Sequence, residues 1–144
     1  MPPDIESTIL DQSSQRKNTL KIAIILFRFV RSDGEAKMLE LMHMSEILRK
    51  DFSLTQVELE EVFKLADRID KKGESTEDIL VAVRDQWSAQ DRAKLLEYLW
   101  IIAFADDKID AKETGLIETI ASQLGLSRMD QARSQEKAET HLGL

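Results

Sequence analysis

Two segments of the chain are apolar on almost every side, and they restrict the possible fold more than any other feature. They are LKIAIILFRFV at residues 20–30 and LLEYLWIIAFA at residues 95–105. In a soluble domain, a helix of this kind has to be surrounded by other helices. The β-branched run in the first segment also fits a strand, but the second segment has the pattern of a helix. We therefore predict that both segments are helices at the centre of a bundle.

The same two segments belong to an internal repeat. Residues 20–33 align with residues 93–106, an offset of 73 (106 minus 33). In each copy the apolar helix leads directly into an acidic turn, and the same offset pairs Glu40 with Glu113. The sequence therefore predicts two helix–acidic turn–helix units related by a pseudo-twofold axis.

Further helices are expected between the two copies. Three pairs place Ser or Thr three residues before an acid, as at the start of a capped helix: Thr55 and Glu58, Ser75 and Asp78, Ser88 and Asp91. No proline occurs between residues 17 and 126. We predict linking helices at 55–71 and 75–86, and an all-α fold that is a single globular bundle of about seven helices.

The ends of the chain differ from its middle in composition. Residues 1–16 lack sustained apolar periodicity and are predicted to be a flexible tail. Residues 17–132 are predicted to form the helical domain. Residues 133–144 carry few apolar anchors, so we expect them to be a frayed C-terminal helix or tail.

Charge and composition exclude several classes of function. The net charge of −7 disfavours nucleic acid and anionic membrane surfaces as partners, and favours cations or basic protein surfaces. The absence of cysteine excludes thiol chemistry and disulfides. The apolar run at 20–30 is too short to span a membrane, so we predict a cytoplasmic protein.

The acidic turns are the clearest candidates for a functional site. Asp110 and Glu113 have the spacing of a capping box, which needs no ligand. Asp106 with Glu113, and Asp33 with Glu40, are separated by seven positions across a turn and have no simple local partner. We interpret Asp33, Glu40, Asp106 and Glu113 as candidate metal ligands. The alternative, that these acids only stabilise helix starts, stays open.

Carboxylate oxygens suit Ca²⁺ or Mg²⁺ rather than a softer metal. An EF-hand loop beginning at Asp106 would need Gly and Glu where the chain has Ala111 and Ile117. Any site would therefore combine acids from separate turns. No other cofactor is predicted.

The sequence contains no recognisable catalytic motif. It has no Walker loop, no GxGxxG and no GxSxG. His43 lacks the spacing of a metalloprotease motif and is interpreted as a partly buried helix residue. We predict that the protein is not an enzyme. The remaining enzymatic alternative requires two carboxylates with separated pKa values in one cleft.

Several large apolar residues are open to a structural or an interaction role. We interpret three methionines and both tryptophans as core residues: Met38, Met42, Met44, Trp87 and Trp100. The alternative for the methionines is an adaptable groove for a protein partner. Ile101 is a candidate exposed residue that would seal a homodimer, and a monomer fits equally well.

The segment LLEYLWIIAFADDKIDAKETGLIETIASQLGLS, with its weaker copy LFRFVRSDGEAKMLELM, resembles the tellurite-resistance protein B (TerB) family. The resemblance covers about residues 17–132, and it is closest to the small stand-alone bacterial members. The family's repeated Ala-Asp-Gly-Glu turn and acidic helix start are matched by these residues: Ser32, Asp33, Gly34, Glu35 and Glu40, then Ala105, Asp106, Asp110 and Glu113. Departures from the family pattern occur at Lys37, Asp107 and Lys108.

The resemblance implies an all-helical domain linked to tellurite resistance and stress responses in bacteria. In some relatives the domain is fused to J-domain co-chaperones, and divalent metal binding at the acidic turns is suggested for the family. No established reaction comes with it. We therefore expect a non-enzymatic module that binds a divalent cation or a basic partner through its acidic turns. The alternative is a protein-interaction scaffold whose acids are only helix caps.

Overall fold

The computed structural model describes residues 18–31, 38–73, 75–106 and 111–144. These residues form seven α-helices and a short 3-10 helix, and no strand occurs among them. In chain order they are the helix at 18–30, α2 (Met38–Asp51), α3 (Gln56–Lys71), α4 (Thr76–Gln86), α5 (Ala89–Ala103), η1 (Phe104–Asp106), α6 (Ala111–Gln123) and α7 (Arg128–His141). The all-α prediction is confirmed.

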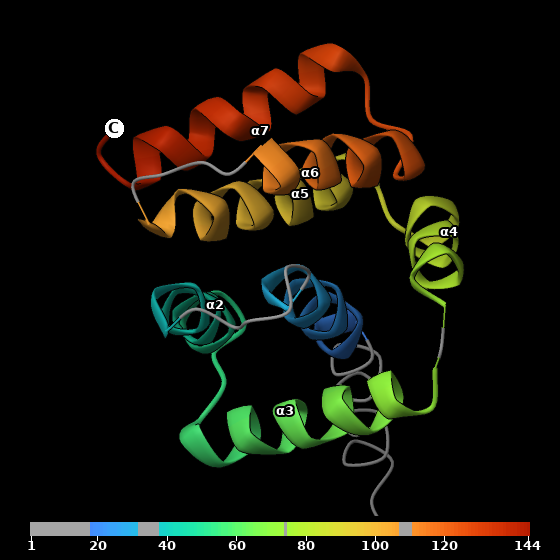
Figure 1. The fold of residues 1–144 in the computed structure, drawn as a ribbon, viewed down its shortest axis with the longest axis vertical. Helices are drawn as coiled ribbons and strands as arrows, with labels where there is room; N and C mark the ends of the chain where they lie inside the picture. Colours follow the sequence, from blue (N-terminus) through green and yellow to red (C-terminus); the bar gives the residue numbers. More distant parts are fainter. Residues whose placement is uncertain (1–17, 32–37, 74, 107–110) are drawn as a thin grey trace, which may run out of the picture.

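The helices are stacked in layers (Figure 1). α7 lies over α5 and α6, the helix at 18–30 and α2 form the next layer, and α3 lies beyond them. α2 packs against both α3 and α5, whereas α4 lies at one side and packs against α6. α5 is therefore covered by helices from both halves of the chain.

The helix starts follow the capping patterns in the sequence. The Thr55 hydroxyl accepts a hydrogen bond from the Glu58 amide at 3.1 Å, and the Glu58 carboxylate accepts one from the Thr55 amide at 3.1 Å. The Ser75 and Ser88 hydroxyls cap α4 and α5 by accepting hydrogen bonds from the amides of Asp78 and Asp91. These capping bonds satisfy amides that have no partner within the helix.

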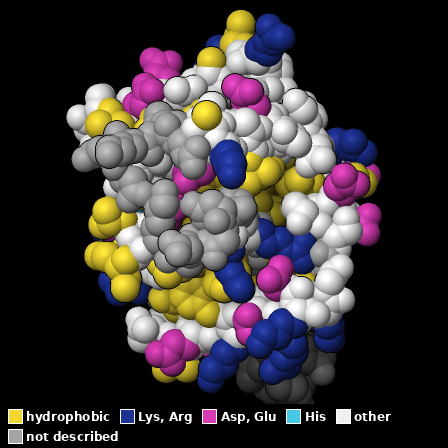
Figure 2. Space-filling view, in the orientation of Figure 1, with side chains coloured by type: hydrophobic (Ala, Val, Ile, Leu, Met, Phe, Trp, Pro, Cys, Tyr) yellow, Lys and Arg dark blue, Asp and Glu magenta, His cyan; other side chains and the backbone are white. Residues whose placement is uncertain are grey.

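The core is built around the two apolar helices, as predicted. The side chains of Leu26 and Leu99 are completely buried. Ile101 is only 3% exposed, so the expectation that it seals a homodimer is wrong. The reason is that α5 is covered on all sides around this residue. Outside the core, Figure 2 shows Lys and Arg interspersed with Asp and Glu over the face in view rather than separated by sign.

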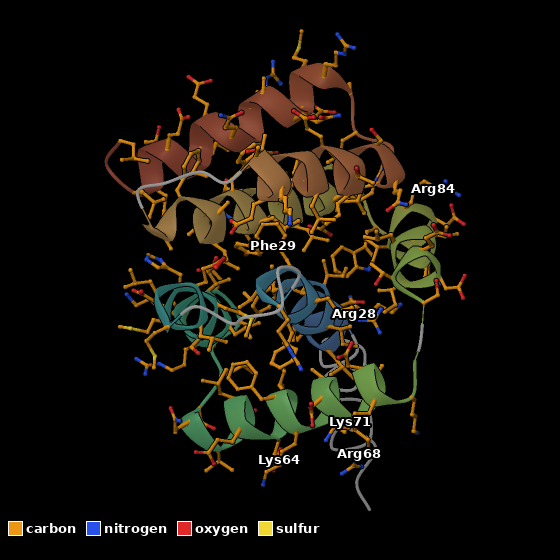
Figure 3. All side chains as sticks on the ribbon, in the orientation of Figure 1. Arg28, Phe29, Lys64, Arg68, Lys71 and Arg84 are labelled. Atoms are coloured by element: carbon orange, nitrogen blue, oxygen red, sulfur yellow. The ribbon has the colours of Figure 1, made fainter. Side chains whose placement is uncertain are left out.

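Arg28 fastens the linking helices to the central layer. Its Nε donates to the Asp70 carboxylate at 2.9 Å, and its Nη1 donates to the Thr76 hydroxyl at 2.7 Å. Asp70 lies near the end of α3 and Thr76 is the first residue of α4. Figure 3 shows Arg28 directed toward these two helices and Phe29 directed toward α5 and α6. One helix thus contributes both to the core and to the position of the linking helices.

Residues 133–141 are helical, which is one of the two forms predicted for them from the sequence. They continue α7 and pack with it along α5, instead of forming a frayed end. The buried side chains of α7 are the small residues Ser134 and Ala138. The Ser134 hydroxyl lies 3.0 Å from the Ala93 carbonyl of α5. Small residues allow two helices to approach closely, so the segment packs without the large apolar anchors that we looked for.

Candidate functional site

Glu40 and Glu113 occupy the same position in their helices. Each is the third residue, Glu40 of α2 and Glu113 of α6. Both are buried, with exposed fractions of 2% and 5%. The offset of 73 between them in the sequence (113 minus 40) therefore corresponds to a matching structural position.

Burial separates these two glutamates from the other acids at the same helix position. Glu58 and Asp130 are partly exposed, and Asp78 and Asp91 are exposed. A carboxylate taken out of water needs hydrogen bonds or opposite charge to offset the loss of hydration. Glu40 and Glu113 do have interaction partners within the structure. The comparison shows that capping a helix does not require this degree of burial.

The other two candidate ligands are described less fully. Asp33 lies outside the described residues. The backbone of Asp106 forms the end of η1, but its side chain is outside the described part, as is Asp110. η1 packs against α2, the helix that carries Glu40. The structure thus brings the end of one apolar helix next to the glutamate-bearing helix of the other copy.

The metal prediction stays a prediction. Within the described ranges, no group of three or more His, Cys, Asp or Glu side chains is arranged to hold a metal ion. Glu40 and Glu113 offer oxygen donors, which fit Ca²⁺ or Mg²⁺, and the remaining predicted donors are outside those ranges. His43 is half-buried on α2, as predicted from the sequence.

Sequence reasoning missed a cavity at the opposite end of α2. It has a volume of about 490 Å³ and lies where the end of α2, the start of the helix at 18–30 and one face of α5 meet. Six of its lining residues have charged or aromatic side chains: Asp51, Phe52, Trp87, Asp91, Lys94 and Tyr98. The only local signal is that Asp91, Lys94 and Tyr98 recur at helical spacing in α5.

Tyr98 is the most perturbed titratable group in this cavity. Burial raises the pKa of its hydroxyl, and the hydrogen bond that it donates to the Asp51 carboxylate raises that pKa further. The Tyr98 ring packs against Phe52 edge to face, with centroids 6.0 Å apart. Lys94 places its ammonium 5.5 Å from the Tyr98 ring centroid and 2.7 Å from the Glu97 carboxylate.

A second surface feature lies between α2 and α3. Met38 and Met42 are 72% and 59% exposed, so the interpretation of these two residues as core is wrong, whereas Met44 is fully buried. Met38 and Met42, together with Leu59 and Phe63, line a groove of about 500 Å³. Figure 2 shows hydrophobic side chains at the surface on this side of the molecule.

The two tryptophans differ from each other. Trp100 is 5% exposed and stacks on Phe104 with ring centroids 5.7 Å apart, which confirms it as a core residue. Trp87 is half-buried, packed against the core and part of the cavity wall. Neither indole Nε1 has a hydrogen-bond acceptor among the described residues.

No helix in the described part of the chain is long and apolar enough to cross a membrane. No match was found among the curated proteins. A crystal structure of a protein of unknown function from Porphyromonas gingivalis W83 is similar, with a TM-score of 0.63 and 20% sequence identity. The similarity covers 85% of this chain and 94% of the other, and at this identity it supports the fold alone.

The family comparison agrees with the repeat and the helical architecture. Residues 19–136 match the family described as tellurite resistance protein TerB. The match spans both helix–acidic turn–helix units and most of α7. Since it covers far more than half of the sequence, the chain belongs to the TerB family.

Proposed function

We propose that this TerB-family protein is a non-enzymatic module of the bacterial stress and tellurite response that binds a divalent cation or a basic partner through its acidic turns. The ligands in this proposal are Asp33, Glu40, Asp106 and Glu113. The observation that carries it is the burial of Glu40 and Glu113 at equivalent positions of the two repeats. The other acids at the third position of a helix in the same protein remain at least partly exposed.

Chemistry favours a hard cation for such a set. Carboxylates are the oxygen donors that Ca²⁺ and Mg²⁺ prefer, and bound positive charge would offset the cost of burying two glutamates. The net charge of −7 also attracts cations and basic protein surfaces over longer distances. A cytoplasmic location, which fits the reasoning from composition, remains part of the proposal.

Calorimetric titration of the EDTA-stripped protein with Ca²⁺, Mg²⁺ and Mn²⁺ tests the proposal. We expect saturable binding by the unmodified chain and its loss in the double variant Asp106→Asn with Glu113→Gln. Glu58→Gln is the matched control, because Glu58 is also the third residue of a helix but belongs to a capping box with Thr55. It should leave metal binding unchanged.

Two results would count against the cation reading. The first is no binding at millimolar metal, and the second is equal binding by the double variant and the unmodified chain. If metal does not bind, a basic peptide is titrated next, and the same pair of variants decides whether the acidic turns hold it.

A protein-interaction scaffold is the second candidate function, favoured by the exposure of Met38 and Met42 beside the groove between α2 and α3. Methionine side chains adapt to different apolar partners, and an amphipathic helix would fit such a groove. Binding of a candidate partner should fall in Met38→Ser with Met42→Ser. It should persist in Val81→Ser, which changes an exposed apolar residue on α4.

A further inference from the structure

The cavity beside the end of α2 combines aromatic walls with carboxylates. Phe52, Trp87 and Tyr98 supply three rings from three separate parts of the chain. Asp51 and Asp91 supply two negative charges. Aromatic rings attract a cation through their negative faces, with Trp the strongest, and nearby carboxylates add to that attraction. The chemistry of this wall therefore selects for positive charge.

Lys94 is the one cation among the six residues of this wall, and it is already compensated. Its ammonium lies 2.7 Å from the Glu97 carboxylate, and Glu97 is buried. The same ammonium lies over the Tyr98 ring. The structure thus contains one example of an ammonium held between a carboxylate and an aromatic face at this place. A free anion entering the cavity would instead meet Asp51 and Asp91.

The two carboxylates have different roles in the wall. The Asp51 carboxylate interacts with the Tyr98 hydroxyl and raises its pKa, so a negative charge and an aromatic ring are neighbours in the wall. The Ser88 hydroxyl caps α5 by accepting a hydrogen bond from the Asp91 backbone amide, and the Asp91 side chain is exposed to solvent. The cavity volume of about 490 Å³ is within the range of small-molecule sites.

We propose that this cavity binds a small organic cation, an alkylammonium or quaternary ammonium compound, between Trp87, Phe52 and the carboxylates of Asp51 and Asp91. The site is separate from the acidic turns and does not depend on the function proposed for them. Selection comes from charge and aromatic contact rather than from metal coordination.

Choline and its neutral carbon isostere, 3,3-dimethylbutan-1-ol, are the probes that separate charge from shape. The Trp100→Phe variant leaves Trp87 as the sole tryptophan, so its fluorescence reports on the cavity wall. We expect saturable quenching by choline and at least about tenfold weaker binding of the neutral isostere. Calorimetric titration of the unmodified chain gives the same comparison without the substitution in the core.

Substitutions then test the residues of the wall. Asp91→Asn should weaken choline binding about fivefold, since it removes one nearby charge. Asp130→Asn is the matched control, because the Asp130 amide donates to the capping hydroxyl of Ser127 as the Asp91 amide donates to that of Ser88, but Asp130 is not part of the cavity wall. Trp87→Leu should weaken choline more than the neutral isostere.

Three outcomes of the ligand titrations would overturn the proposal. They are no choline binding in either assay up to about 10 mM, equal binding of choline and its neutral isostere, or binding of acetate in preference to choline. Equal losses of choline affinity in Asp91→Asn and Asp130→Asn would likewise contradict the proposal, because they would show that choline does not bind in this cavity. Saturable choline binding that Asp91→Asn weakens and Asp130→Asn leaves unchanged supports it.

Discussion

α5 and α7 lie side by side, and they pack by opposite means. α5 buries a continuous run from Leu95 to Ala103 that is mostly large and apolar. α7 buries only Ser134 and Ala138, and the rest of its surface is polar or solvent-exposed to some degree. The difference shows that, in one interface, the large apolar side chains can come from one helix, while the small side chains of the neighbouring helix allow the two backbones to approach closely. Substitutions can test each half of that statement.

The largest effect is expected from Leu99→Ala in α5. Leu99 is completely buried, and removal of its side chain loses apolar contact and leaves a cavity. The free energy of unfolding should fall by about 2–5 kcal/mol, measured by urea denaturation. Leu65→Ala in α3 is the control, because Leu65 is 41% exposed and should lose far less stability. Similar losses in the two variants would contradict the central role of α5.

Ala138→Leu tests closeness of approach in α7. Ala138 is completely buried, so a larger side chain has to push α7 away from its neighbours. We expect a loss of about 1–3 kcal/mol in the free energy of unfolding. Ala132→Leu, at an exposed position of the same helix, should change stability by less than about 0.5 kcal/mol. Tolerance of leucine at both positions would mean that α7 is not closely packed.

Tyr98 sharpens the comparison by probing a polar group on the apolar helix. Burial and the bond to Asp51 raise the pKa of its hydroxyl, so the folded protein keeps the proton where the unfolded chain releases it. Stability is therefore unaffected below the ordinary tyrosine pKa of about 10 and falls above it, by about 1.4 kcal/mol per pH unit. Denaturation across this pH range should show the fall, and Tyr98→Phe should lack it.

The same expectation has an optical check. Tyr98 is the only tyrosine of the chain, so tyrosinate absorbance reports on this residue alone. In the folded protein the absorbance should rise only at a pH well above the value seen in urea. Titration at the same pH in both states would contradict the description of the Tyr98 environment.

The smallest effect is expected from Ser134→Ala. The Ser134 hydroxyl lies 3.0 Å from the carbonyls of both Ala93 and Asp130, so it joins α7 to α5. Its loss should reduce the free energy of unfolding by about 0.5–1.5 kcal/mol. Ser122→Ala is the control at an exposed position of α6. An unchanged stability in Ser134→Ala would leave Ala138 as the main contact of α7.

The fold was predictable where a structural feature is determined by residues close together in the sequence. The Thr55 capping box and the two apolar segments each determine their structure within a few residues, and the repeat relates the two halves. The packing of residues 133–141 was not predictable, because Ser134 and Ala138 provide no pattern of large apolar residues. Small residues at an interface are informative only when the neighbouring helix is known.

The candidate sites divide in the same way. Glu40 and Glu113 were found because the repeat places them at equivalent positions, but their burial depends on helices far away in the sequence. The cavity was missed because Asp51, Trp87 and Tyr98 come from separate segments that only the tertiary structure brings together. Exposure of Met38 and Met42 was also beyond local patterns, since helical spacing does not show which helix face is covered.

Arg28 has a consequence for the symmetry of the molecule. At the repeat offset of 73 its counterpart is Ile101, which is buried in the core, and the counterpart of Arg31 is Phe104. The two central helices therefore occupy equivalent positions in the repeat but make different contacts. The helix at 18–30 holds α3 and α4 through Arg28, whereas the segment of α5 from Leu95 to Ala103 is buried throughout. In this molecule, the linking helices attach at a position where the two similar units differ in side-chain chemistry.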